Sequence, residues 1–113
     1  MDQTAAKIRQ LVPGLRAAAI AHVNALREAG LPAVIIDARR SAARQRAYLA
    51  AGKSRSLKSY HLVGRAYDIG WLGVRDRDVP DAWWNYAGSV GKAIGFRWGG
   101  DFRSLIDKPH FEF

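Results

Sequence analysis

The sequence contains no cysteine and no long hydrophobic run. Without cysteine among its 113 residues, the chain has neither disulfide bonds nor thiolate metal sites, so a metal ion can be bound only through imidazole and carboxylate groups. No segment approaches the roughly 18 apolar residues of a membrane-spanning helix. The start, MDQTAAKIRQ, lacks the basic-then-apolar order of a secretory signal peptide, and we therefore expect a protein made in the cytoplasm.

Acidic residues are outnumbered by basic ones. Eighteen Lys and Arg against ten Asp and Glu give a formal net charge of +8 at pH 7. This charge favours an anionic partner such as nucleic acid, anionic lipid or a cell-wall polymer. The basic residues are scattered, apart from local clusters in DARRSAARQR and GKSRSLKS, and scattered charge is also typical of an ordinary solvated surface. Hydrophobic residues at 49% and charged residues at 25% indicate a globular domain.

Apolar residues recur at three- and four-residue steps in several segments, which predicts helices. Over residues 4–29, Pro13 divides the pattern into a short helix and a longer one. SAARQRAYLAAG predicts a further helix with Ser41 as its N-cap. Asp78 is expected to cap the last helix, whose apolar stripe consists of Trp83, Ala87, Val90 and Ile94.

Short β-branched or alternating segments predict strands. They are PAVIIDA (32–38), GRAYDIGWLG (64–73) and PHFEF (109–113). Alternation in the second places Asp68 on the face opposite to Tyr67, Ile69 and Trp71. FRWGGDF is expected to be a turn and GKSRSLKS a polar loop. The predicted class is therefore α+β, with a small antiparallel sheet and flanking helices in one domain over residues 1–113.

His61, Asp68 and His110 suit a metal ion. Asp68 follows His61 by seven residues in SYHLVGRAYDIG, and His110 occurs in DKPHFEF near the C-terminus. Two imidazoles and one carboxylate form the donor set of a zinc site that keeps a fourth position open for water. The H-E-x-x-H motif is absent, and histidines are more commonly structural than metal-binding. On spacing alone, metal binding and structural support both remain open.

Hydrolysis by a metal-activated water also needs a proton acceptor and a positive group near the developing oxyanion. Asp107 stands three residues before His110 and is a candidate for the acid/base. Arg40 directly precedes a predicted helix and could hold a substrate carboxylate or the oxyanion. Glu112 alternates with His110 and could hydrogen-bond a metal ligand. His22 lies beside an apolar stripe and is expected at the edge of the core.

Four segments occur in the order in which one known family has them. SYHLVGRAYDIG is similar to an S-x-H-x-x-G-x-A-x-D signature, ARRSAARQ to a Y-R-S-x-x-x-Q segment, WGGDF to a W-G-G-D-W turn and DKPHFEF to a closing segment. Over residues 38–113 the chain thereby resembles the zinc D-alanyl-D-alanine carboxypeptidases and related L-alanyl-D-glutamate endopeptidases, which include phage endolysins. Phe102 replaces the usual tryptophan. Arg39 replaces the usual tyrosine, which leaves open whether Arg39 or Arg40 faces the site.

The resemblance implies a role for each matching residue. The zinc ligands would be His61, Asp68 and His110, the acid/base would be Asp107, and Arg40 would bind the substrate or the oxyanion. Ser59 would line the site, and Trp98 would either line the cleft or serve in packing. It also implies a zinc-dependent peptidoglycan peptidase. We expect the L-alanyl-D-glutamate bond of the stem peptide as the target, with D-Ala-D-Ala carboxypeptidase activity as the alternative.

Partners and place of action follow from the same resemblance. We expect a monomer that acts on peptidoglycan stem peptides in the cell wall, without a nucleic-acid partner. Because a signal peptide is absent, the expected route of release is a lesion made by a holin. Two readings of other classes stay open. One is a non-catalytic basic module that binds cell wall or nucleic acid, and the other is a domain with a purely structural zinc ion.

Overall fold

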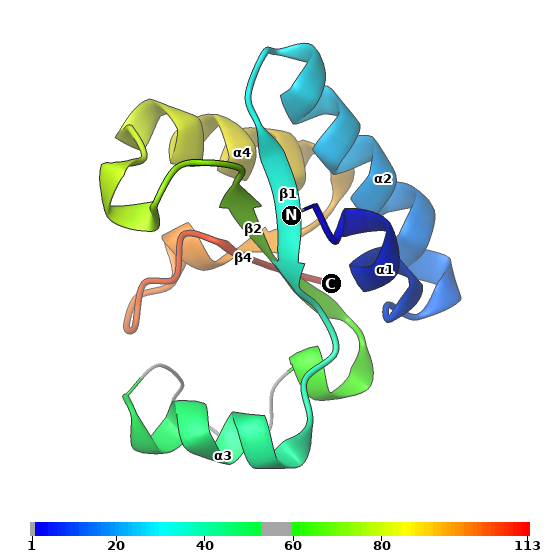
Figure 1. Ribbon diagram of the computed structural model, residues 1–113, viewed down its shortest axis with the longest axis vertical. Coiled ribbons are helices and arrows are strands. Elements are labelled where there is room, and N and C mark those ends of the chain that lie inside the picture. The colour runs from blue at the N-terminus through cyan, green and yellow to red at the C-terminus, as the bar shows by residue number, and fades with distance from the viewer. Residues whose placement is uncertain (1, 53–59) are drawn as a thin grey trace.

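Four antiparallel strands form the sheet at the centre of the computed structural model, which describes residues 2–52 and 60–113 (Figure 1). Within these residues the strands are β1 (Ala33–Asp37), β2 (Ala66–Trp71), β3 (Arg97–Trp98) and β4 (His110–Glu112), in the order β1-β2-β4-β3. The helices are α1 (Thr4–Arg9), α2 (Pro13–Glu28), α3 (Ala42–Ala50) and α4 (Asp81–Ile94). Short 3₁₀ turns are η1 (Tyr60–Val63), η2 (Asp76–Asp78) and η3 (Gly99–Asp101). The predicted α+β class with a small antiparallel sheet is confirmed.

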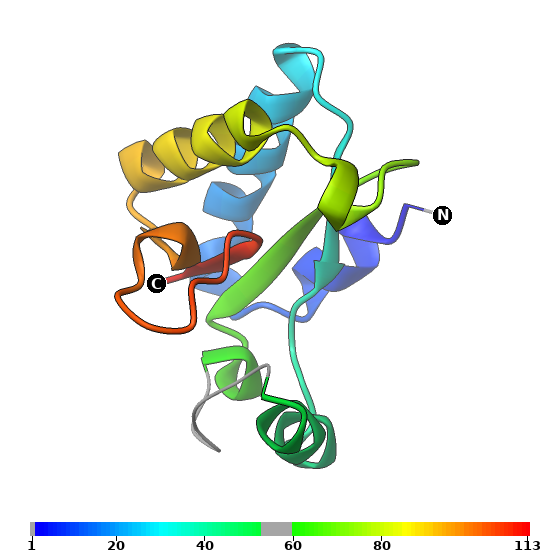
Figure 2. The ribbon, with the colours of Figure 1, turned by 90° about the vertical axis from the view of Figure 1, so that its left-hand side faces the viewer.

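In the described part of the chain, the helices that pack on the sheet cover one of its faces. Figures 1 and 2 show α2 and α4 side by side on that face and α3 set apart beyond the end of β1. The core between helices and sheet contains apolar side chains that are at most 3% exposed, among them Leu11, Ala19, Val23, Leu26, Ile35, Tyr67, Ile69, Trp71 and Phe111. The other face of β2 is thus left for polar groups.

The predicted helix boundaries near Pro13 and Ser41 are confirmed. Pro13 is the first residue of α2, where its missing N–H costs no hydrogen bond. The Ser41 side chain accepts a hydrogen bond from the Arg44 N–H at 3.1 Å and caps α3. This cap places Arg40 immediately before the helix.

The prediction for the start of α4 is wrong. Pro80 occupies the N-cap position, while Asp78 belongs to η2 and pairs with Arg75. The buried side of α4 also differs from the predicted stripe, because it includes Gly88 and Gly91. A Cβ at these two positions would collide with the rings of Trp98 and Phe111, so the helix packs closely through its glycines. Trp83, Val90 and Ile94 lie partly buried at the edge of this contact.

FRWGGDF is more than the predicted turn. Arg97 and Trp98 form β3, which pairs with β4, and η3 follows directly. A two-residue strand is too short to give a periodic signal. Of the predicted polar loop GKSRSLKS, residues 53–59 lie outside the described part of the chain.

Candidate metal centre

β2 and β4 each place one candidate ligand on the face of the sheet that the helices leave open. Asp68 lies directly opposite His110 in the register of this pair. Residues directly opposite in an antiparallel pair share a face. Their neighbours Tyr67, Ile69 and Phe111 lie on the other face, in the core, and are at most 1% exposed.

His61 reaches the same place from η1, just before β2. Its imidazole is buried, and Nδ1–H donates a 2.6 Å hydrogen bond to the Ala38 carbonyl. Its own carbonyl accepts from the Arg40 N–H at 3.0 Å. Gly64 then turns the chain into β2 with a φ of 71°, and a Cβ there would lie 2.9 Å from the Gln10 carbonyl oxygen. Only glycine fits this turn without strain.

Three ligand atoms converge at the centre. His61 Nε2 lies 3.2 Å from Asp68 Oδ1, His110 Nδ1 lies 3.3 Å from the same oxygen, and the two nitrogens are 3.1 Å apart. Tetrahedral zinc with metal–ligand distances of about 2.0–2.1 Å places its ligand atoms about 3.3 Å from one another. The observed spacing therefore matches one face of such a tetrahedron, with the fourth corner left over.

In each histidine, the hydrogen bond made by the ring nitrogen outside the centre fixes the tautomer of the ring. His61 Nδ1–H is donated to Ala38, and His110 Nε2–H is donated to Glu112 Oε1 at 2.7 Å. With both rings neutral, the two converging nitrogens therefore carry lone pairs. Asp68 Oδ1 is buried and accepts no hydrogen bond from any described residue. Three electron-rich atoms in such close contact need positive charge between them, from a proton or a metal ion, and their spacing fits a divalent metal ion.

The electrostatics of the centre also favour positive charge. Burial lowers the pKa of His110, but Asp68, Glu112 and Asp107 outweigh it and raise this pKa to about 9. Burial raises the pKa of Asp68, but the close approach of His110 and His61 holds it well below its usual range. The centre thus attracts a proton or a metal ion at neutral pH.

Glu112 makes the hydrogen bond that the sequence predicts. Its Oε1 accepts from His110, and its Oε2 pairs with Arg97 at 2.8 Å. A carboxylate behind a metal-binding imidazole fixes the orientation and tautomer of the ring.

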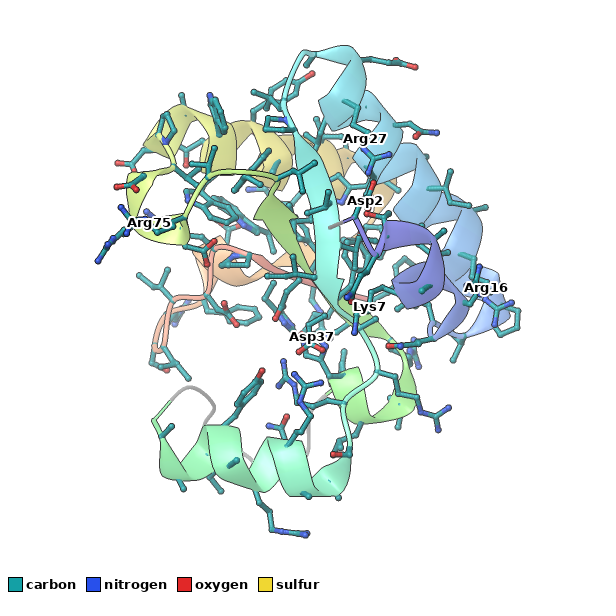
Figure 3. The ribbon with its side chains drawn as sticks, viewed as in Figure 1. Asp2, Lys7, Arg16, Arg27, Asp37 and Arg75 are labelled. Carbon is teal, nitrogen blue, oxygen red and sulfur yellow. The ribbon has the colours of Figure 1, made fainter. Side chains whose placement is uncertain are left out.

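Arg40, and not Arg39, faces the centre. Arg40 is 7% exposed, and its Nη2 lies 3.6 Å from Asp68 Oδ2, whereas Arg39 is exposed. Asp37 Oδ2 accepts from Nη2 of Arg40 at 2.9 Å. The sequence analysis missed Asp37, although a charged residue at the end of the apolar strand AVIID was a usable signal. Figure 3 shows Asp37 where β1 leaves the sheet towards α3.

Asp107 is held beside the centre by its backbone. Its N–H donates to the Gly99 carbonyl at 2.9 Å, and its carbonyl accepts from the His110 N–H at 3.1 Å. Burial and the charge of Asp68 raise the pKa of its carboxyl group, although the two imidazoles and Arg40 act in the opposite direction. A carboxyl group with a raised pKa next to a metal site suits proton transfer.

The part of the chain that carries most of these residues matches a known family. Residues 52–113, more than half of the chain, match the family model described as D-alanyl-D-alanine carboxypeptidase. The matched range includes His61, Asp68, Asp107 and His110. The chain belongs to the D-alanyl-D-alanine carboxypeptidase family. The resemblance drawn from the sequence motifs is thereby confirmed.

Two similar proteins of known name extend the family assignment. The L-alanyl-D-glutamate peptidase of Listeria phage A118 is 30% identical over 119 residues, which cover 99% of this chain and 41% of the relative. The chain therefore spans about two fifths of the length of this curated relative. The crystal structure of the Serratia marcescens L-Ala D-Glu endopeptidase ChiX matches with a TM-score of 0.69 and 26% identity, covering 98% of this chain and 86% of that one.

Two further residues implied by the family resemblance have different outcomes. Ser59 lies outside the described residues. The Trp98 indole is buried, with its Nε1–H donated to the Lys108 carbonyl at 2.7 Å and its ring against Gly88 of α4. This placement favours a packing role for Trp98, and its contact with substrate stays a prediction.

Among the described helices, none is long and apolar enough to span a bilayer.

Proposed function

We propose that this chain is a zinc-dependent peptidase that cleaves the stem peptides of peptidoglycan. The observation that carries the proposal is the convergence of three lone-pair donors beside Arg40 and Asp107. Family membership supports it, and the two similar proteins are named for cleavage between L-Ala and D-Glu. We therefore take the L-alanyl-D-glutamate bond as the target. D-Ala-D-Ala carboxypeptidase activity, which the family description names, is the second candidate.

The proposed mechanism assigns one task to each group. His61 Nε2, Asp68 Oδ1 and His110 Nδ1 would hold the zinc ion. A zinc ion held there would supply Lewis acidity, which lowers the pKa of a water molecule and polarises a carbonyl group. Asp107 accepts the proton of the attacking water and passes it to the departing amine as the C–N bond breaks. Arg40 donates to the oxygen on which negative charge develops.

The charge of the chain agrees with an anionic wall polymer as the place of action. The proposed substrate is the stem peptide itself, and the proposed location is the cell wall. Release through a holin lesion, a monomeric state and the absence of a nucleic-acid partner stay predictions.

A digestion assay with purified protein and defined muropeptides tests the proposal. Chelation should abolish cleavage, and added zinc should restore it, with products that end in L-alanine and begin with D-glutamate by mass spectrometry. Loss of terminal D-alanine alone would favour the second candidate. Wall binding that survives chelation without any hydrolysis would favour a non-catalytic basic module. Unfolding on chelation, again without hydrolysis, would identify a structural zinc ion.

The same assay tests the acid/base. Asp107→Asn should lower kcat about a hundredfold or more with one zinc ion still bound, because the proton acceptor is lost. Asp101→Asn is the matched control, since Asp101 is exposed and pairs with Lys92 on the surface. Full activity of the Asp107 variant with zinc bound would show that another group moves the proton.

A further inference from the structure

An irregularity in β1 brings Asp37 to the metal centre. The register of β1 and β2 pairs Ile35 with Ile69 and then Asp37 with Asp68, so that Ile36 is an extra residue. A β-bulge of this kind redirects the side chain that follows it. With regular alternation Asp37 would share the core face with Ile35. The bulge instead places its carboxylate opposite the candidate ligand Asp68.

Arg40 bridges these two carboxylates. Its Nε and Nη2 donate to Asp37 Oδ2 at 3.2 and 2.9 Å, and Nη2 lies 3.6 Å from Asp68 Oδ2. Asp37 is 5% exposed and Arg40 is 7% exposed, so water screens these charges weakly. The guanidinium offsets the repulsion between the carboxylates. Asp68 is left with Oδ1 directed at the two imidazoles.

The Arg40 guanidinium also contacts two residues of α3. Its Nη1 donates to Gln45 Oε1 at 2.7 Å, and its Cζ lies 4.2 Å from the centre of the Tyr48 ring. The second oxygen of Asp37, Oδ1, lies 3.6 Å from Nη1 of Arg44. Asp37 therefore contacts two guanidinium groups, those of Arg40 and Arg44. Among the contacts of the Arg40 guanidinium with described residues, Asp37 is the carboxylate that accepts two of its hydrogen bonds.

We propose that Asp37 is a positioning residue that fixes the Arg40 guanidinium against Asp68, ready to meet the oxyanion. The consequence for catalysis rests on the proposed function, whereas the orientation of Arg40 rests on the contacts alone. A donor that is held in place before reaction stabilises the transition state without reorganisation. Loss of Asp37 should therefore lower kcat and leave KM nearly unchanged.

The first test reads the Arg40 side chain by NMR and needs no activity. In the ¹⁵N-labelled protein the Arg40 Nε–H should exchange slowly with solvent, and its resonance is identified by its loss in Arg40→Lys. Asp37→Asn should raise this exchange rate at least about tenfold, because the charged acceptor is gone. Unchanged exchange in a folded Asp37→Asn protein would overturn the proposal.

A surface pair provides the matched control. Asp78 accepts from Arg75 Nε at 3.2 Å with the same three-residue spacing, but both side chains are more than half exposed. Figure 3 shows Arg75 at the rim of the molecule, away from Asp37. Asp78→Asn should leave the Arg40 exchange rate and the kinetic constants unchanged.

The second test is kinetic and asks whether Asp37 acts through Arg40. Asp37→Asn should lower kcat about tenfold or more and change KM less than about threefold. In an Arg40→Lys background, the same substitution should lower kcat less than about twofold. Equal losses in both backgrounds would reveal a merely structural role and overturn the proposal. If Asp37→Asn does not fold, Asp37→Ser leaves room for a water molecule and takes its place. A wild-type protein without metal-dependent cleavage would refute the proposed function, and the exchange experiment would still decide the role of Asp37.

Discussion

Buried histidines on the two faces of the sheet differ in the hydrogen bonding of their ring nitrogens. On the core face, His22 Nε2–H donates to the Ala87 carbonyl at 2.9 Å, and Nδ1 accepts from the Tyr67 hydroxyl at 2.7 Å. On the open face, His61 and His110 each use one nitrogen for such a bond and turn the other towards a shared point. Saturated hydrogen bonding is what a structural histidine needs. Lone pairs gathered around one point are what a metal ion needs.

Neighbouring charge accounts for the contrast in protonation. Burial lowers the pKa of His22 to about 4, although its bond to the Ala87 carbonyl acts in the opposite direction. Burial also acts to lower the pKa of His110, yet the carboxylates of Asp68 and Glu112 raise it to about 9. Burial alone is therefore a poor guide to what a histidine does. The charges around the ring separate the two cases.

Replacing one histidine on each face by glutamine should give the largest contrast. His61→Gln should lower cleavage at least about a thousandfold, because a ligand of the activating ion is lost. His22→Gln should keep cleavage and lower the free energy of unfolding by about 2 kcal/mol, because two buried partners lose their bonds. Muropeptide hydrolysis by the zinc-loaded proteins measures the first effect. Denaturant unfolding of the metal-free proteins measures the second. Similar losses of activity and stability in the two variants would contradict the assignment of a metal-binding role to His61 and a structural role to His22.

The stability of the metal-free protein should depend on pH through His22. Unfolded His22 binds a proton below pH 6.5, and folded His22 binds one only below about pH 4. Between these values the unfolded state holds more protons, so the free energy of unfolding should fall by about 3 kcal/mol as the pH is lowered through this window. Subtracting the His22→Gln curve isolates this term from those of the carboxyl groups. Parallel curves for the two proteins would show that folding leaves the pKa of His22 unchanged.

Glu112→Gln should give the smallest of these effects. The amide keeps the shape of the side chain but loses the charge that supports His110, so zinc affinity should fall about tenfold. Competition with a chromophoric chelator measures the affinity. Glu28→Gln, at an exposed position on α2, is the control. An unchanged affinity would mean that the hydrogen bond to His110 does not tune the centre.

The sequence singled out the three residues that converge at the centre but missed much of their surroundings. His61, Asp68 and His110 lie in motifs, and the alternation in β2 already separated Asp68 from the core face. The close packing of α4 through Gly88 and Gly91 was not predictable, since glycines add nothing to an apolar stripe. The role of Asp37 depends on a bulge, and local periodicity carries no signal for a one-residue shift in pairing. Both of these features arise from contact between segments that lie far apart in the sequence.

The pairing of Asp68 with His110 also determines when the centre can exist. β4 is the last strand in the chain order, and its pairing with β2 brings one ligand to the other two. A slip of one residue would turn His110 into the core and leave Phe111 in its place. A partly folded chain, or one with misaligned strands, would therefore hold two ligands at most, and hydrolytic competence would arise only with the completed sheet.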